Sequence, residues 1–514
     1  MTSSSDLLTV YIAADTGARS VGADELAVAV IDFAKRNSLS LRVLRPGSRG
    51  MYWLEPMLEV STETGRVAFG PLQPRDVDAV LRTDGRVVES HPKYLGPTER
   101  IEQLRCQKRK TFKRIGLIEP TDIGAYREHD GFAGLICALS MSAPELVDAV
   151  TASGLRGRGG AAFPTGIKWK TVLEAPDDTK YIVCNADEGD SGTFADRMVM
   201  ESDPFMLVEG MTIAGLATGA HHGYVYLRAE YPQAVETMNR AIRIAIEQGF
   251  LGDNILGSGR RFTLEVRQAA GAYICGEETS LLESLEGKRG VVRYRPPLPA
   301  IKGLFGKPTV VNNVISLAAV PGIIHEGADT YASIGAGKSR GTITLQLGGN
   351  VKRGGLFEVP FGVPLRDVLF NMGGGSASGR PIRAVQAGGP LGAYIPESKF
   401  DTPIDYEAFK AIGAMLGHGG LVVFDDTVDL GHMARFAMEF CAIESCGKCT
   451  PCRIGAVRGA EVIDEILDGR DVPANRALLR ELCDTMIEGS LCGLGGMAPL
   501  PVVSVLDNFS DDLR

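Results

Sequence analysis

The sequence predicts an α/β protein of several domains, and three observations lead to this prediction. The chain has 514 residues, whereas a typical domain has about 150. Its 44% hydrophobic and 23% charged residues are ordinary for a globular protein and exclude a disordered one. Short β-type runs and helix-type periodicities alternate through most of the chain, while residues 426–514 show mainly helical patterns.

Charge and glycine content narrow the classes of function. The 54 basic and 63 acidic residues give a net charge of −9, which argues against a general nucleic-acid-binding protein. The chain has 63 glycines, more than the usual ~7% of residues, and they follow no collagen-like period. Such an excess suggests that backbone approaches ligands closely at several places.

Targeting and membrane signals are not evident in the sequence. Residues 1–6 lack the basic segment and the small-residue cleavage site of a signal peptide. The most apolar stretch, Met206–Ala220, contains Glu209 and is too short to span a bilayer. Ten cysteines in so long a chain do not form a disulfide scaffold. We therefore expect a cytoplasmic protein without membrane insertion.

Residues 1–110 predict a small domain with thioredoxin-like order, βαβ followed by ββα. The strand-like runs are Leu7–Ala14, Leu39–Leu44, Met57–Val60 and Arg66–Phe69. Helical patterns cover Asp24–Arg36 and begin again at Pro74. No cysteine precedes Cys106, so we expect no redox pair and no cluster ligands in this domain.

The rest of the chain divides into a connector and three further domains. Residues 89–114 are polar and basic, which predicts a solvated connector or, alternatively, a clasp onto a partner chain. A glycine-rich α/β domain is expected over 111–335, a small β-rich domain over 336–425, and a helical domain with a cysteine cluster over 426–514.

The cysteine cluster predicts an iron–sulfur site. Cys446, Cys449 and Cys452 follow one another at three-residue steps, a spacing that lets one turn of backbone wrap a [4Fe-4S] cubane. Structural zinc usually takes two separate cysteine pairs, so zinc and an unligated cluster of thiols are the weaker alternatives. The fourth ligand is Cys483 or Cys492; the glycine-rich loop around Cys492 favours that residue, because Cys483 lies in a helical run.

A glycine-rich segment, residues 154–166, predicts a phosphate-binding loop. It contains the pattern G-x-G-x-x-A from Gly157 to Ala162, but a helix-like segment precedes it where a Rossmann turn needs a strand. We therefore expect a differently built cradle, in which Arg156, Arg158 and Lys168 add positive charge. An ordinary surface loop is the alternative.

Polar side chains follow three apolar runs downstream of this loop. The strand-like Tyr181–Cys184 leads into Asn185–Gly189, and Ala272–Cys275 leads into Glu277 and Glu278. Asn312 and Asn313 follow a third run. Amides suit a flavin edge and carboxylates suit ribose or nicotinamide donors, at the strand ends where open α/β sheets bind ligands. Paired carboxylates also occur in glycosidases, but an iron–sulfur cluster in the same chain makes hydrolysis a poor match.

Five motifs, in order, resemble the NADH-binding flavoprotein subunit of respiratory complex I. They are residues 154–169, 185–197, 272–282, 308–314 and 446–455. The same module occurs in NAD-reducing hydrogenases and in the β subunit of NAD-dependent molybdenum formate dehydrogenases. The resemblance covers about 115–510 and implies FMN, NAD(H) and one [4Fe-4S] cluster, held by a Rossmann-like domain, a ubiquitin-like β-grasp domain and a C-terminal helical bundle.

The resemblance also implies individual contacts, and it implies no catalytic side chain for hydride transfer between cofactors. The implied FMN contacts are Gly157, Gly159, Lys168, Asn185, Asp187, Glu277, Asn312 and Asn313. The implied NAD contacts are Phe163, which would stack on adenine, Glu188, Tyr273 and Glu278. The implied cluster ligands are Cys446, Cys449, Cys452 and Cys492. Related flavoproteins often carry K-P-P-F-P near the dinucleotide, whereas this chain has Arg295–Pro299 with leucine in place of the aromatic residue.

The N-terminal domain resembles the thioredoxin-like [2Fe-2S] subunit that partners this flavoprotein, here fused to it and without cysteines around Met51–Pro56. A fused domain without a cluster is similar to the β subunit of soluble formate dehydrogenases and also to the hydrogenase flavoprotein, and we favour the first. We expect a diaphorase that passes electrons between NAD(H), FMN and the cluster, because a flavin exchanges electrons in pairs or singly. It would reduce NAD⁺ with electrons from a molybdenum-containing, formate-oxidising subunit and a small [2Fe-2S] subunit. The alternatives are a hydrogenase or complex I diaphorase, or a non-catalytic electron conduit.

Overall fold

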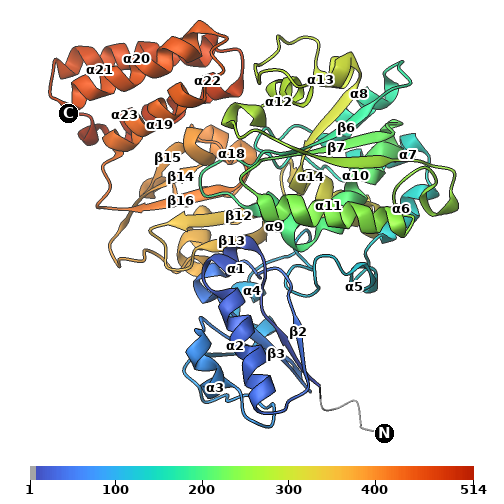
Figure 1. Cartoon of the computed structure of the whole chain (residues 1–514). Helices are drawn as coiled ribbons and strands as arrows, with labels where there is room; N and C mark the ends of the chain where they lie inside the picture. Colours follow the sequence, from blue (N-terminus) through green and yellow to red (C-terminus); the bar gives the residue numbers. More distant parts are fainter. Residues whose placement is uncertain (1–6) are drawn as a thin grey trace.

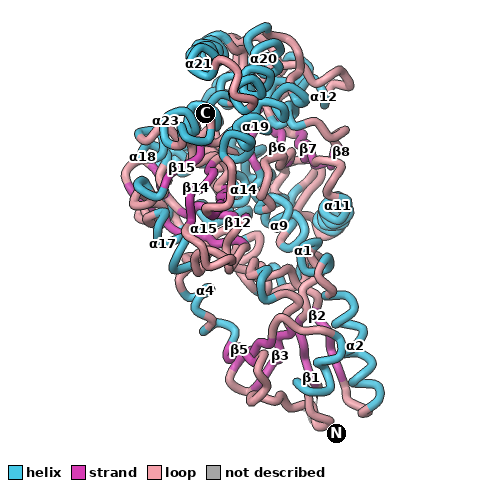
Figure 2. The backbone as a smooth tube through the Cα atoms, turned by 90° about the vertical axis from the view of Figure 1, so that its left-hand side faces the viewer, coloured by secondary structure: helices cyan, strands magenta, loops and turns pink. Residues whose placement is uncertain are grey.

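The computed structural model describes residues 7–514; residues 1–6, in which we expected no signal peptide, lie outside the described residues. The fold is mixed α/β with several sheets, as predicted. In Figure 1 an N-terminal sheet lies at the bottom, two further sheets lie side by side in the middle, and a group of helices lies at the top. Figure 2, a view at right angles, shows the same arrangement.

The N-terminal unit is a five-stranded sheet in the order β2-β1-β3-β4-β5. Its elements are β1 (Leu8–Tyr11), α1 (Thr16–Ser20), α2 (Ala23–Arg36), β2 (Leu41–Leu44), β3 (Leu58–Thr62), β4 (Gly65–Phe69), α3 (Val77–Val80), β5 (Tyr94–Pro97) and α4 (Glu102–Arg105). Strands β1 and β2 are parallel, and β3 pairs antiparallel with β4 around the predicted hairpin turn. Strand β5 was not predicted, since it is short and ends in Gly96 and Pro97, residue types that are uncommon in strands.

The N-terminal unit docks through the loop after β1. The buried carboxylate of Asp15 accepts hydrogen bonds from the Ser48 amide at 2.6 Å and from the Tyr52 hydroxyl at 3.1 Å. Next to it, the Thr16 amide donates to Glu201 at 2.7 Å, on a helix of the neighbouring unit. This loop therefore faces the unit that carries the glycine-rich segment.

The second unit has a four-stranded parallel sheet in the order β8-β7-β6-β9. Its elements are α5 (Ile123–Glu128), α6 (Ala133–Leu139), α7 (Ala143–Ala152), α8 (Thr165–Glu174), β6 (Tyr181–Ala186), α9 (Ala195–Ser202), α10 (Pro204–Thr218), β7 (His222–Leu227), α11 (Pro232–Glu247), β8 (Thr263–Gln268), α12 (Glu278–Leu285), α13 (Pro299–Lys302), β9 (Thr309–Asn313), α14 (Val314–Ala318), α15 (Val320–Glu326) and α16 (Ala328–Ala332). The apolar stretch noted in the sequence forms α10, which is buried along its whole length. Within residues 7–514, no helix combines the length and apolar character needed to cross a membrane.

The third unit is a mixed five-stranded sheet in the order β13-β12-β16-β14-β15, with β12 and β16 parallel at its centre. Its elements are the short strands β10 (Gly335–Ala336) and β11 (Ser339–Arg340), then β12 (Thr342–Gly349), β13 (Gly355–Pro360), α17 (Leu365–Asp367), β14 (Ile382–Ala387), β15 (Ala393–Pro396), α18 (Tyr406–Ala411) and β16 (Gly420–Asp425). Helix α17 is one short turn of α-helix that continues as a π-turn over Val368–Met372.

Helices alone make up the C-terminal unit, as predicted. They are α19 (Leu430–Glu444), α20 (Thr450–Leu467), α21 (Val472–Gly489), α22 (Gly493–Met497) and α23 (Pro499–Asn508). Their apolar core continues into residues of both middle sheets, such as Val183 on β6 and Tyr394 on β15. The cysteine-rich turn between α19 and α20 is thereby held against the second unit.

The basic connector is a clasp within the chain itself. Three consecutive amides, of Lys110, Thr111 and Phe112, donate to the carboxylate of Glu358 on β13 at 2.9, 2.9 and 3.0 Å. The Thr342 hydroxyl donates to the same carboxylate at 2.5 Å. Glu358 is 0% exposed, so a single buried anion holds this part of the connector on the third sheet. The expectation of a solvated connector is wrong here, because the sequence does not show which distant acid meets its amides.

We predict that Glu358→Ala destabilises the protein by about 3 kcal/mol or more, because several buried N–H donors lose their acceptor. Thermal unfolding should begin earlier, and trypsin should cleave faster at the basic residues of 108–114. Glu236→Ala, at an exposed position on α11, is the control and should change stability by less than about 0.5 kcal/mol. Unchanged stability and unchanged cleavage in the Glu358 variant would contradict this account of the clasp.

Candidate functional site

The glycine-rich segment forms a loop between α7 and α8, so a helix precedes it, as the sequence suggested. The Gly157 amide donates to the Phe163 carbonyl at 2.8 Å and folds the loop back on itself. Gly160 has φ +103°, and a Cβ placed on it would lie 3.5 Å from the backbone of Gly417. A Cβ on Gly159 would lie only 3.0 Å from that of Asn313. Glycine is thus needed where the loop packs against β9 and against the third unit.

Of the three basic side chains expected to add charge to this loop, only Lys168 faces the strand ends. The Arg158 guanidinium is buried and donates to the Thr342 carbonyl at 3.1 Å and to the Tyr331 hydroxyl at 2.9 Å. Arg156 donates to the Ala162 carbonyl and forms an ion pair with Glu407. The expectation for both arginines is corrected: they hold the loop to the third unit.

Lys168 lies between two of the predicted motifs. Its Nζ donates to the Val311 carbonyl at 2.7 Å and lies 3.3 Å from a carboxylate oxygen of Glu278. Next to it on α8, the buried Trp169 donates to the side-chain oxygen of Asn312 at 2.9 Å. Helix α8, strand β9 and the paired carboxylates therefore meet around Lys168.

The ends of β6 and β9 bring their polar side chains together, since Asn185 pairs with Asn313 in parallel register. The Asn185 amide donates to the Gly276 carbonyl at 2.8 Å. Next along the chain, one carboxylate oxygen of Asp187 is buried without a hydrogen-bond partner among residues 7–514. Burial raises the pKa of Asp187 to about 7. A buried polar atom without a partner is the kind of group that a ligand satisfies.

The segment with the paired carboxylates is not a strand, although its apolar run repeats the pattern before Asn185. Tyr273–Gly276 forms one 3₁₀ turn that leads directly into α12. Glu277 caps this helix by accepting the amides of Thr279 and Ser280 at 2.9 Å. Glu278 lies 3.3 Å from the guanidinium of Arg295, the residue that begins the altered proline-rich segment.

Glu188 differs most from its predicted role as a dinucleotide contact. It is 5% exposed, and its two carboxylate oxygens accept the amides of Asp196 and Arg197, each at 3.1 Å. Asp190, two residues later, is more exposed and accepts the hydroxyl of Tyr273 at 2.7 Å. The sequence analysis did not single out Asp190. It contacts Tyr273, a predicted site residue, but the two are far apart in sequence, so no local pattern links them.

Phe163 lies on the outer part of the glycine-rich loop. Its side chain is 49% exposed, unlike the aromatic residues of the cores. An exposed ring next to a glycine-rich loop suits stacking on a flat ligand, which keeps the predicted adenine contact open.

The four predicted cluster ligands lie in the C-terminal unit at two loops. Cys446 and Cys449 are in the turn before α20, Cys452 is in its first turn, and Cys492 immediately precedes α22. Burial raises the pKa of Cys492 to about 11, although backbone amides of Leu494 and Gly495 partly offset this. Cys483 is 0% exposed on α21, as expected for a buried apolar side chain.

The thiol spacing fits a cubane better than a single metal ion. A tetrahedral zinc site needs sulfurs about 3.8 Å apart, given Zn–S bonds of about 2.3 Å. In the part of the chain that the structure describes, no three cysteine sulfurs lie within 4.8 Å of one another. The four thiols are thus not arranged as around a single tetrahedral zinc ion, whereas a [4Fe-4S] cubane holds its thiolates farther apart.

The cysteine turn is in direct contact with the strand-end site. The carboxylate of Glu444, two residues before Cys446, accepts the Tyr273 amide at 3.0 Å. The rings of Tyr273 and Phe440 meet edge to face at 5.0 Å, and Lys448 donates to the Val292 carbonyl at 2.6 Å. The two predicted cofactor sites are therefore neighbours.

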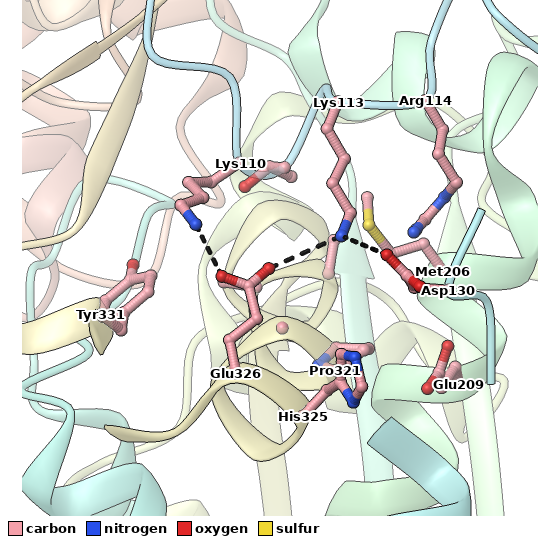
Figure 3. A pocket seen from close by; sticks show the side chains of 14 residues that line it. Lys110, Lys113, Arg114, Asp130, Met206, Glu209, Pro321, His325, Glu326 and Tyr331 are labelled. Atoms are coloured by element: carbon pink, nitrogen blue, oxygen red, sulfur yellow. Dashed lines mark hydrogen bonds and ion pairs between the residues drawn. The ribbon is translucent and has the colours of Figure 1, made fainter. Parts of the chain in front are cut away.

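A separate cavity lies between the connector and α15 (Figure 3). Lys110 pairs with Glu326 at 2.6 Å, and Lys113 lies 3.5 Å from Glu326 and 3.8 Å from Asp130. No predicted cofactor residue is among the described residues that line this cavity. Because both lysines are paired with acids, we assign the cavity to the clasp and not to the functional site.

Comparisons with known proteins agree with this arrangement. A family model described as "Nuo51 FMN-binding domain" matches residues 150–322, and one described as "NADH-ubiquinone oxidoreductase-F iron-sulfur binding region" matches residues 432–514. The HndC component of the NADP-reducing hydrogenase of Solidesulfovibrio fructosivorans is 46% identical over 415 residues, 81% of this chain and 84% of that protein. The chain belongs to the family of NADH-binding FMN/[4Fe-4S] flavoproteins.

Members of this flavoprotein family include proteins of respiratory complexes and of hydrogenases. The chain is 39% identical to an NADH-quinone oxidoreductase subunit of Escherichia coli K12 over 399 residues, 77% of this chain and 90% of that protein. A crystal structure of an NAD⁺-reducing [NiFe]-hydrogenase in its H₂-reduced state aligns with a TM-score of 0.70 and 29% identity, covering 98% of this chain and 83% of that one. The flavoprotein chain therefore has an FMN-binding domain and a [4Fe-4S] region, and its predicted cofactors are confirmed.

We predict that Cys492→Ala lowers the iron content of the purified flavoprotein well below the wild-type value of about four per chain. Cys483→Ala is the matched control and should retain iron, because its thiol is enclosed in the core of α21. Iron and acid-labile sulfide per chain measure both variants. If the control loses its iron and the Cys492 variant keeps it, the fourth ligand is Cys483.

Proposed function

We propose that this flavoprotein is the diaphorase subunit of a cytoplasmic, NAD⁺-reducing formate dehydrogenase. It would receive electrons from a molybdenum-containing, formate-oxidising subunit and a small [2Fe-2S] subunit. The contact between the Glu444 carboxylate and the Tyr273 amide supports the diaphorase function most directly, because it joins the cysteine turn to the turn before Glu277 and Glu278. The fused N-terminal unit, which has no cysteine before Cys106, supports the formate branch of the family, by the resemblance noted from sequence.

The flavin residues proposed from sequence fit the group that the family binds. Gly157 and Gly159 place no side chain between their backbone and a ligand, and Lys168 supplies charge. Asp187 offers a buried carboxylate oxygen without a partner among the described residues. The remaining proposed contacts, at the same edge of the parallel sheet, are Asn185, Glu277, Asn312 and Asn313. When bound, FMN converts hydride transfer by NAD(H) into single-electron exchange.

The chain's own residues would mainly bind and orient. Phe163 and Tyr273 are the proposed ring contacts of the dinucleotide, and Glu278 is its proposed carboxylate contact at the start of α12. We propose Asp190 in place of Glu188 as the second carboxylate, because the oxygens of Glu188 already accept backbone amides. No side chain is needed as acid or base for hydride transfer between two cofactors.

The strand orders support the proposed domain assignments, thioredoxin-like for 1–110, Rossmann-like for 111–335, β-grasp for 336–425 and a helical bundle for 426–514. In the first sheet, parallel β1 and β2 lie beside the antiparallel β3 and β4. In the third, the parallel pair β12 and β16 lies at the centre, with antiparallel β13 and β14 outside it.

A hydrogenase diaphorase is the second candidate. The 46% identity to a hydrogenase subunit and the alignment of 98% of this chain with an NAD⁺-reducing hydrogenase favour it. Metal analysis of the co-purified complex separates the candidates: molybdenum or tungsten supports formate dehydrogenase, nickel supports hydrogenase, and membrane subunits support complex I.

The diaphorase function itself predicts that the purified chain contains FMN and catalyses NADH-driven reduction of an artificial electron acceptor. Flavin release and the rate of acceptor reduction are the measurements. A chain that carries its cluster but neither flavin nor this activity would be an electron conduit, and the proposal would fail.

We predict different effects for the two neighbouring acids. Asp190→Asn should raise KM for NADH by about tenfold with little change in kcat, because an acceptor for the ribose hydroxyls is weakened. Glu188→Gln should instead lower thermal stability and flavin content, since its new amide group faces the α9 amides. Steady-state kinetics and flavin content after gel filtration distinguish them; a rise in KM confined to the Glu188 variant would restore the original assignment.

A further inference from the structure

Three buried titratable side chains form a cluster beneath the glycine-rich loop. Glu188, Asp196 and His418 are 5%, 1% and 6% exposed. Glu188 and Asp196 come from the segment that follows β6, while His418 lies in the turn that enters β16 of the third sheet. The predicted motifs did not include His418 or give a role to Asp196, and the proposed hydride transfer does not use them.

The contacts of His418 define its charge. Its Nδ1 lies 2.7 Å from the Arg158 carbonyl, and its Nε2 lies 3.2 Å from Glu188 and 3.3 Å from Asp196. Carbonyl and carboxylate oxygens only accept, so both ring nitrogens must donate. A histidine that donates from both nitrogens is an imidazolium cation.

The same contacts argue against a metal ion, although the three side chains offer ligand atoms within 4.8 Å of one another. A doubly protonated ring has no lone pair for a metal. Glu188 already accepts the Asp196 and Arg197 amides at the start of α9, where the helix dipole favours an anion and repels a cation. The imidazolium is therefore the counter-charge of this acidic pair.

This cluster is connected to the proposed flavin contacts on two sides. Arg158, whose carbonyl accepts from His418, lies between Gly157 and Gly159 in the loop. Asp196 accepts the side-chain amide of Asn313 at 2.7 Å. His418 thus contacts the glycine-rich loop through the Arg158 carbonyl, and it is linked to Asn313 through the carboxylate of Asp196.

The surrounding charges keep the ring protonated. Burial alone would lower the pKa of His418, but Asp196 and Glu188 outweigh it and raise that pKa well above its ordinary value. Burial raises the pKa of Asp196 to about 6. Other ionisable groups also face the cluster. Burial raises the pKa of Asp190, although Tyr273 and His418 oppose this, and Tyr231 donates to Glu188. Arg197 interacts electrostatically with Glu188, and Cys184 with Asp196.

We propose that His418 is a positioning residue of the FMN site, which as a buried imidazolium ties the glycine-rich loop to α9 and supplies a fixed positive charge beneath the cofactor. This inference rests on the proposed FMN contacts. Reduction adds negative charge to a bound flavin, and a nearby buried cation favours that addition because the surroundings screen it poorly. With His418 charged, the cluster has one net negative charge; with a neutral residue, it has two.

The test uses the full-length protein and measures FMN affinity and the midpoint potential of the bound flavin. His418→Gln should weaken FMN binding by about tenfold or more, as expected for losing charged hydrogen bonds, and should shift the potential to more negative values. The double variant His418→Gln/Asp196→Asn restores the net charge and should return the potential towards that of the wild type. His432→Gln, at an exposed position on α19, is the control and should change neither quantity.

The possible outcomes separate the two proposals. Wild-type affinity and potential in the His418 variant would overturn the inference, and so would weaker binding with an unchanged potential, because that result indicates a purely structural side chain. A wild-type protein without any FMN would overturn the proposed flavin site first.

A second measurement needs no variant. In ¹⁵N-histidine-labelled wild-type protein, one of the seven histidines should stay doubly protonated at about pH 8, above the ordinary histidine pKa of about 6.5. If all seven lose a proton below that pH, the inference is wrong even where the His418 variant does not fold.

Discussion

The contact between the C-terminal helices and the turn before α12 determines what this molecule can do. The Glu444 carboxylate accepts the Tyr273 amide, and Lys448 reaches over to the Val292 carbonyl from between Cys446 and Cys449. The C-terminal unit holds the cysteines of the cluster, and the second unit holds the residues proposed for the flavin and the dinucleotide. A cluster exchanges single electrons, and a dinucleotide exchanges hydride, so their sites are useful together only if packing fixes them side by side.

Buried carboxylates accept backbone amides at several places where two segments of the chain meet. Glu358 accepts three amides of the connector, and Glu209 accepts those of Phe132 and Leu135 at the start of α6. Glu188 does the same for α9. A buried anion is costly unless it is fully hydrogen-bonded, so each such acid stabilises one backbone arrangement over its alternatives. The glycine-rich loop depends on the last of these through His418.

How far the sequence predicts this structure depends on how local each signal is. The helix over Asp24–Arg36 and the strand from Tyr181 show in their own periodicity, and α2 and β6 match them closely. The helix before the glycine-rich loop was also predicted. Because a Rossmann turn follows a strand, this helix argued against one. The roles of Arg158 and Glu188 could not be predicted in this way, since their partners Tyr331 and His418 lie more than a hundred residues away. Spacing identifies which residue types gather, but only packing decides which of them remain accessible to a ligand.

The loops of the N-terminal unit are held by hydrogen bonds within the unit and to the second unit. Tyr52 lies in the stretch around Met51–Pro56, where this chain has no cysteines. Its hydroxyl donates to Asp15. The other oxygen of that carboxylate accepts the Ser48 amide, and the adjoining Thr16 binds Glu201 of the second unit. Polar groups of this chain therefore fill the hydrogen bonds of Asp15 and Thr16, and the loop that holds these two residues contacts the second unit. The N-terminal unit thus packs on the flavin-binding unit through this loop, and the C-terminal helices that flank the cysteine turn lie at the opposite end of the molecule (Figure 1).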